Sequence, residues 1–171
     1  MSTSFLNARD IDFGNVKPLD LNRDALKPDS AATPFSKLVW AVASGDMKTV
    51  EAQVTDDVEW GLMPYNKVLK GKGEVIPMLR AATAEQKKPI VITNAISKDW
   101  GVFEYWNIGI FSEEVMKYGN EQKWPWPKDP TTFLGQKYRV AQCFVYHFTP
   151  NGKIDFMRQY LDTGSVWAQF K

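Results

Sequence analysis

The chain has 171 residues, the size of one domain that can bury a core of its own. Its 21 basic and 20 acidic residues leave a formal net charge of +1, which argues against a nucleic-acid-binding protein. A single cysteine, Cys143, excludes an internal disulfide and any multi-cysteine metal site, and a single histidine, His147, excludes a multi-histidine metal centre. We therefore expect no metal ion and no cofactor.

Aromatic residues are the positive feature of the composition. Seven Trp, six Tyr and ten Phe make up 13% of the chain. This content predicts a soluble protein with a large aromatic interior or pocket. The first ten residues lack the features of a signal peptide, and no stretch approaches the roughly 20 apolar residues of a membrane span. With an unpaired cysteine, these observations predict a cytoplasmic protein with neither a membrane nor a nucleic-acid partner.

Residues 1–33 are predicted to form an N-terminal extension, because they are polar and show no sustained period. Two interpretations remain open for them. Scattered apolar residues would let the segment lie over the domain or over a partner subunit, or the segment is a partly disordered tail. These apolar residues are Phe5, Leu6, Ile11, Phe13 and Leu19.

The domain itself is expected over residues 34–171, and it begins with helices. Thr33-Pro34 is a helix start, with Thr as N-cap and Pro at the first helical position. Apolar residues then recur at helical spacing as far as Val42, and Gly45 ends this first helix. Asp46 is placed to cap a second helix, from Met47 to about residue 54.

A turn, a strand and a third helix are expected next. Asp56-Asp57 is predicted to form the turn, and residues 58–62 the strand. Lys70 to Gly73 is predicted to be a loop, and the third helix to run over residues 74–86. Pro77 would then fall in the first turn of that helix, where a backbone N–H has no partner.

The rest of the chain is predicted to be a series of strands. Residues 90–96 and 102–111 are rich in β-branched and aromatic residues, and residues 112–134 are expected to be a long connection. A long strand over 137–148, an Asn-Gly turn and a strand over 154–161 form a hairpin, followed by a short terminal segment. Helices followed by an antiparallel meander predict an α+β domain whose curved sheet wraps the helices.

Two residues near the end of the chain are candidates for acid–base chemistry. Asp162 follows a strand that carries Phe156, Arg158 and Tyr160 at a period of two, and His147 lies on the preceding strand. A carboxyl group among aromatic rings can have a raised pKa and serve as general acid or base. The structural alternatives are an N-cap for Asp162 and an exposed strand position for His147.

The strand over 102–111 supplies further polar candidates. Tyr105 and Asn107 share the face opposite to that of Glu104. A buried tyrosine hydroxyl and an amide can hold a substrate oxygen or an attacking water. Tyr105 can equally be a core residue, and Glu104 can simply face solvent.

Two aromatic segments are candidates for a ligand wall. Trp60, Met63 and Tyr65 follow the second helix, and Trp124 and Trp126 form a Trp-Pro-Trp-Pro run inside the long connection. The run is expected to be a lid over a hydrophobic ligand, with a wrapping loop or a dimer contact as alternatives.

The order and spacing of several short motifs resemble those of SnoaL-like proteins of the nuclear transport factor 2-like superfamily. The motifs are Ser44-Gly45-Asp46, Thr55 to Trp60, Gly71 to Glu74, and the segment from His147 to Asp162. The resemblance covers about residues 34–171. It implies a cone-shaped α+β barrel, in which N-terminal helices pack into a highly curved, mostly antiparallel sheet around a deep cavity. It also implies a homodimer formed through the sheet.

The resemblance carries functional roles to particular positions. In SnoaL-like polyketide cyclases, a histidine before the Gly-Lys-Ile turn and an aspartate after the last strand perform acid–base chemistry. His147 and Asp162 occupy those positions in this chain.

Other activities of the superfamily fit the sequence less well. Limonene epoxide hydrolases resemble it at Met63-Pro64 and at Arg158 to Asp162, but only Asp162 matches their catalytic set. Tyr105 and Asn107 stand where their Arg and second Asp belong, and Trp60 and Leu62 stand where their water-holding pair belongs. Ketosteroid isomerases need a Tyr and an Asp where this chain has Leu38 and Leu62, and scytalone-dehydratase-type sites need more than one histidine.

The first hypothesis is therefore a cofactor-independent acid–base enzyme acting on a hydrophobic, aromatic small molecule. Lyase, isomerase or cyclase chemistry fits, through aldol or retro-aldol reaction or dehydration, on a substrate such as a lignin-derived bis-aromatic diol or a polyketide. Asp162 would be the acid or base, with His147 or Tyr105 polarising an oxygen. The residues expected to contact substrate are Trp60, Met63, Tyr65, Trp106, Asn107, Trp124, Trp126, Arg158 and Tyr160. The alternative is a non-catalytic module for hydrophobic-ligand binding or dimerisation.

Overall fold

The computed structural model describes residues 33–170, apart from the side chains of residues 86 and 87. The predicted extension, except Thr33, lies outside the described residues. Within the described part, helices and strands occur in the order expected for an α+β domain. No described helix combines the length and the apolar character that crossing a membrane requires.

The first two helices begin and end as predicted. Helix α1 spans Pro34–Ser44, and its N-cap Thr33 forms a capping box with Ser36, in which each side chain accepts the other's backbone N–H. Gly45 ends α1 with a φ of +76°, a conformation that favours glycine. The Asp46 side chain then accepts the Thr49 N–H and caps α2 (Met47–Gln53).

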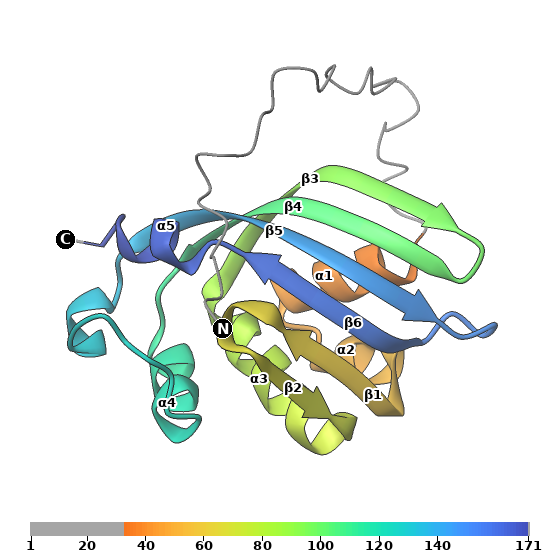
Figure 1. The fold of residues 1–171 in the computed structure, drawn as a ribbon, viewed down its shortest axis with the longest axis horizontal. Helices are drawn as coiled ribbons and strands as arrows, with labels where there is room; N and C mark the ends of the chain where they lie inside the picture. The colour runs from red at the N-terminus through yellow and green to blue at the C-terminus, as the bar shows by residue number, and fades with distance from the viewer. Residues whose placement is uncertain (1–32, 171) are drawn as a thin grey trace, which may run out of the picture.

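Six strands form one curved, mixed sheet in the order β2-β1-β6-β5-β4-β3 (Figure 1). The strands are β1 (Val54–Leu62), β2 (Lys67–Lys70), β3 (Gln86–Ser97), β4 (Trp100–Ile110), β5 (Lys137–Phe148) and β6 (Ile154–Leu161). All neighbours are antiparallel except β1 and β6, which are parallel. The sheet remains open, with β2 and β3 at its edges, so the expected barrel is not closed.

The region between β1 and α3 differs from the prediction. Asp56-Asp57 is not a turn, because β1 runs through both residues. They lie where the pairing of β1 with β6 shifts register, between Val54 and Glu59. Lys70 ends β2, and α3 (Gly71–Glu85) begins at Gly71 without an intervening loop. Pro77 therefore lies inside the helix and not in its first turn.

The predicted long connection contains a helix that was not expected from the sequence. Ser112 caps α4 (Glu113–Glu121) by accepting the Val115 N–H, and two glutamates occupy the first turn. A short 3-10 turn, η3 (Pro130–Phe133), lies in the same connection, and another, η2 (Met63–Tyr65), lies between β1 and β2. The terminal segment forms α5 (Thr163–Trp167).

Helices α1, α2 and α3 gather on one side of the sheet, here called the inner face, while α4 and α5 stand at one end (Figure 1). The core lies between α1 and the inner face. Phe35 of α1 packs its ring against the rings of Phe144 and Tyr146, with centroids 4.7 and 4.8 Å away. A second aromatic cluster surrounds Phe133 beside α4 and α5.

A cavity bordered by the inner face

A cavity of about 120 Å³ lies between helices α1 and α3 and the inner face of β4, β5 and β6. Trp124, Val166 and Trp167 close it at the end occupied by α4 and α5. Most of its wall is apolar, with Phe35 and Val39 contributed by α1 and Met157 by β6. An apolar cavity with a few convergent polar groups is the usual form of a small-molecule site.

Strand alternation determines which polar groups reach this cavity. In β4, buried and partly exposed residues alternate, so Tyr105 and Asn107 face inward and Glu104 faces outward. The same alternation directs Tyr138 and Gln142 of β5 to the inner face. The shared inward face of Tyr105 and Asn107 is as predicted from the sequence.

The first polar group contains Glu85, the last residue of α3. Glu85 lines the cavity, and its carboxyl accepts a hydrogen bond from the Tyr138 hydroxyl. Asn107 in turn donates its amide Nδ2 to the Tyr138 oxygen over 3.3 Å. Burial raises the pKa of Glu85 to about 8, although the hydrogen bond from Tyr138 acts in the opposite direction.

Gly109 is the reason that Tyr138 can reach this carboxyl. The two residues lie opposite each other in the β4–β5 register. A Cβ atom at Gly109 would stand 2.6 Å from the Tyr138 hydroxyl oxygen and 2.8 Å from the Glu85 carbonyl oxygen. The tyrosine therefore crosses the glycine to reach the end of α3, a path that any side chain at position 109 would obstruct.

The second polar group lies two residues along β4, a spacing of about 7 Å. The Tyr105 hydroxyl donates to Gln142 Oε1 over 3.1 Å, and Gln159 Nε2 donates to the same oxygen over 2.9 Å. All three residues are buried and line the cavity. Burial raises the pKa of Tyr105, so its hydroxyl remains a donor at neutral pH.

Aromatic rings form part of the cavity wall, and Tyr65 lies near enough to the first polar group for the charge of Glu85 to raise its pKa. Tyr65 of η2 stacks on Trp124, with centroids 4.9 Å apart and planes 9° from parallel, and both residues line the cavity. Trp60 of β1 adds a third ring. Residues far apart in the sequence thus meet at one wall.

The sequence-predicted contact residues divide into two sets. Four of them line the cavity: Trp60, Tyr65, Asn107 and Trp124. The catalytic candidate Tyr105 lines it as well. The other predicted contact residues are not among the lining residues: Met63, Trp106, Trp126, Arg158 and Tyr160. Trp126 packs edge-on against Phe111 in the second aromatic cluster, and Arg139 stacks on Trp106 on the outer face. Arg158 lies over Phe156.

Asp162 is not among the residues that line the cavity. It is exposed, and its carboxylate accepts the Ser165 N–H over 3.2 Å as the N-cap of α5. This is the structural alternative that the sequence left open. The register pairs Gln142 with Leu161 and His147 with Phe156, so Asp162 and His147 are separated by about six residues along the hairpin, roughly 20 Å.

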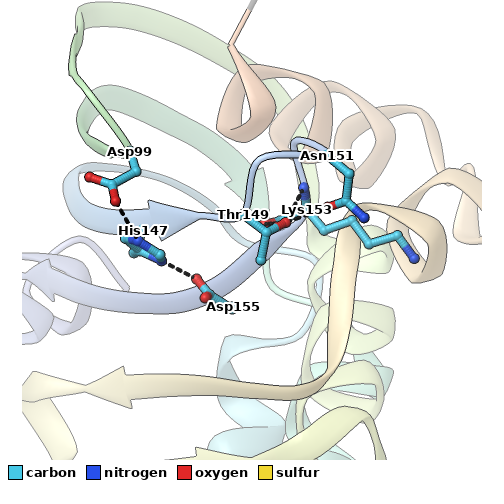
Figure 2. A network of polar contacts seen from close by, with 6 residues as sticks. All are labelled: Asp99, His147, Thr149, Asn151, Lys153 and Asp155. Carbon is cyan, nitrogen blue, oxygen red and sulfur yellow. Dashed lines mark hydrogen bonds and ion pairs between the residues drawn. The ribbon is translucent and has the colours of Figure 1, made fainter.

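His147 lies between two carboxylates on the outer face of the sheet (Figure 2). Its Nδ1 is 2.6 Å from Asp155 of β6, and its Nε2 is 3.2 Å from Asp99 in the β3–β4 turn. The hydrogen bond with Asp155, followed by that with Asp99, raises the pKa of His147. The histidine thus ties three parts of the sheet together and is not brought to the cavity or to Asp162.

Sequence reasoning did not identify Glu85, Tyr138, Gln142 or Gln159 as site residues. Glu85 ends an amphipathic helix, a position at which an acidic residue normally contacts solvent. The glutamines occupy inward positions of strands whose phase the alternation predicts. A polar residue at a strand position that alternation predicts to be buried could have marked these glutamines as site residues.

No protein-family model matches this sequence, and no curated protein matches it. Similar solved structures do exist. An LEH-like epoxide hydrolase from M. tuberculosis is 14% identical, with 80% of this chain and 86% of that chain covered and a TM-score of 0.59. A hypothetical protein with a ketosteroid isomerase-like fold from Catenulispora acidiphila, solved in complex with trimethylamine, is 12% identical, with coverages of 81% and 94% and a TM-score of 0.59.

An NTF2-like protein of unknown function from Burkholderia pseudomallei is 16% identical, with coverages of 81% and 95% and a TM-score of 0.57. At such identities the likeness is one of fold. The chain has the α+β fold of the nuclear transport factor 2-like proteins. The expected α+β fold is thus confirmed, with a sheet that is not closed into a barrel.

The pH dependence of stability tests the contacts of His147. A histidine whose pKa is raised on folding stabilises the folded state fully below its unfolded value near 6.5, and this contribution disappears as pH rises through the folded value. We expect the difference in unfolding free energy between wild type and His147→Asn to shrink between pH 6 and pH 8. Urea denaturation at several pH values measures it. Glu85 titrates in the same pH range in both proteins, so its contribution cancels in the difference between wild type and His147→Asn. A difference in unfolding free energy that does not change with pH would contradict the contacts of His147.

Proposed function

We propose that the protein is a cofactor-independent acid–base enzyme for a hydrophobic, ring-bearing small molecule. The observation that carries the proposal is the carboxyl of Glu85 in the wall of an apolar cavity, hydrogen-bonded to Tyr138. A carboxyl whose pKa lies close to neutral can take and return a proton under physiological conditions.

Glu85 acts as the general base in this proposal. Its raised pKa makes its carboxylate a stronger base than an exposed glutamate. Tyr138 donates to the carboxylate and receives a hydrogen bond from Asn107, so the chain of three fixes the orientation of the carboxyl. Tyr138 and Asn107 are positioning residues.

The second polar group supplies the complementary function. The Tyr105 hydroxyl, which now donates to Gln142, can instead donate to an oxygen of the substrate. This oxygen becomes negatively charged when Glu85 removes a proton from the substrate. Glu85 and Tyr105 line the same cavity, so one small substrate can present its acidic hydrogen to the first and its polarised oxygen to the second. Trp60, Tyr65 and Trp124 then enclose its ring and exclude water.

Proton transfer of this kind fits isomerisation, dehydration, cyclisation and retro-aldol cleavage. Similar structures carry the names of an epoxide hydrolase, a SnoaL-like polyketide cyclase and an isomerase, which supports enzyme-like use of the fold. A lignin-derived bis-aromatic diol and a polyketide-like enone remain the proposed substrate types.

The sequence hypothesis gave the acid–base role to Asp162 and His147. The proposal transfers this role to Glu85, because Glu85 lines the cavity, whereas Asp162 caps α5 and His147 contacts the carboxylates of Asp99 and Asp155. Tyr105 keeps the role that the sequence hypothesis gave it.

Turnover of a panel of bis-aromatic diols and ring enones, followed by NMR, tests the assignment. For any substrate found, we expect Glu85→Gln to lower kcat/KM by about 100-fold or more, as for loss of a general base. The wild-type value should rise with pH and level off above about pH 8, since the free enzyme must be ionised. Asp162→Asn and His147→Asn are the matched controls and should stay within a few-fold of wild type. Loss in either control, with activity retained in Glu85→Gln, would return the role to that residue.

A non-catalytic role in ligand binding is the second candidate function. The same apolar cavity favours it, because binding needs no group that transfers a proton. Saturable binding of panel compounds without turnover would identify a binding module.

We also propose a homodimer formed through the outer face of the sheet. Trp100, Val102 and Tyr160 expose 46, 38 and 42% of their surfaces there. Arg139 lies over a ring on the same face, and Asp99 and Asp155 supply carboxylates, so a two-fold axis can place opposite charges against each other.

Sedimentation velocity measures the oligomeric state. We expect a dimer for wild type and a monomer for Val102→Glu, because a second copy would bury the new charge. Lys48→Gln on α2 changes the charge by the same one unit away from this face and should remain dimeric. A wild-type monomer at tens of micromolar protein would overturn the dimer proposal.

A further inference from the structure

We propose that the cavity accepts a ligand bearing an organic ammonium group, with Glu85 as its counter-ion and the aromatic wall as its cage. This inference deepens the proposed function by naming a chemical class of ligand for the same cavity, and it rests on that function only in sharing the site.

The first argument is charge balance. Ion pairs between described side chains involve other acidic residues, and none of them includes Glu85. A carboxylate removed from water without a cation is strongly disfavoured, so buried carboxylates are normally paired or protonated. No described side chain places a positive charge beside the Glu85 carboxylate. The positive charge must therefore come from a bound proton or from a ligand.

The tyrosines around Glu85 do not satisfy this requirement. Tyr138 donates one hydrogen bond to the carboxyl, and the hydroxyl of Tyr65 lies within the field of the same carboxylate. Burial, followed by the charge of Glu85, raises the pKa of Tyr65 to about 12. Both hydroxyls therefore remain neutral, and they orient a carboxylate without balancing its charge.

The second argument is the chemistry of the wall. The stacked rings of Tyr65 and Trp124 and the ring of Trp60 line the same cavity as the carboxyl. Aromatic faces attract organic cations, and the attraction grows when the cation is removed from water. A carboxylate beside such rings favours an alkylammonium group over a neutral group of the same shape.

Binding of such a cation must be linked to a proton. At pH 7 most Glu85 carboxyls carry a proton, because burial raises the pKa to about 8. A quaternary ammonium ion has no proton to exchange, so its entry releases the carboxyl proton to solvent and leaves a carboxylate–ammonium pair. Affinity should therefore increase about tenfold between pH 7 and pH 9, following the ionised fraction of Glu85.

Isothermal titration with choline and 3,3-dimethyl-1-butanol, a neutral molecule of the same shape, tests this inference. We expect wild type to bind choline at least tenfold more tightly than the alcohol at pH 9, with the pH dependence given above. Glu85→Gln should remove this preference, and Glu104→Gln, which changes a carboxylate on the outer face, should retain it. The pH series on wild type needs no variant and keeps the test valid if Glu85→Gln folds poorly.

Equal affinity for choline and the alcohol, or a preference that survives in Glu85→Gln, would overturn the inference. The outcomes separate it from the proposed function. Turnover that depends on Glu85 without a preference for choline would retain the enzyme and refute the ammonium ligand. A Glu85-dependent preference for choline without turnover of any panel compound would retain the ammonium ligand and refute the enzyme.

Discussion

The carboxyl of Glu85, held in an apolar cavity by Tyr138, is the interaction on which the functional account depends. Water stabilises an ionised carboxyl, whereas an apolar cavity raises its free energy. The groups around the carboxyl therefore determine its pKa. Here one hydroxyl donates to it, and described side chains form no ion pair with it. Burial raises the pKa of this group to about 8, which brings its neutral and charged states close in free energy at neutral pH.

The fold makes this arrangement possible through three local features. Helix α3 ends at Glu85 and brings the carboxyl to the inner face of the sheet. Gly109 leaves the space that lets Tyr138 cross β4 toward it. Helix α1, fixed by the Thr33 capping box and by the packing of Phe35, covers the cavity from the other side. Each feature is local, but the site exists only because the curved sheet assembles them.

Much of this fold could be predicted from the sequence. The caps at Thr33 and Asp46, the Gly45 helix end and the β5–β6 hairpin all follow from local chemistry, and the structure confirms them. Helix α4 escaped prediction because it spans only nine residues, so its signals were limited to the Ser112 cap, the acidic first turn and the spacing of Val115 and Tyr118. The turn expected at Asp56-Asp57 was wrong because tertiary pairing extended β1 through two residues that usually favour turns.

The site was harder to predict. Alternation correctly placed Tyr105 and Asn107 on one inward face, since strand period is a local property. The meeting of Glu85 with Tyr138 depends instead on where a helix ends relative to a strand that begins 52 residues later, and no local pattern encodes that distance. Likewise, the hairpin places His147 and Asp162 on adjacent strands, but only the register revealed how far apart they lie.

The most direct test of this account is the titration of Glu85 itself. Carbon-13 NMR of glutamate side-chain carboxyls, assigned with Glu85→Gln, follows its ionisation in the ligand-free protein. The account predicts a midpoint near pH 8. A midpoint close to the ordinary glutamate value of 4.5 would mean that water or a cation already balances this carboxyl, and it would contradict the central claim.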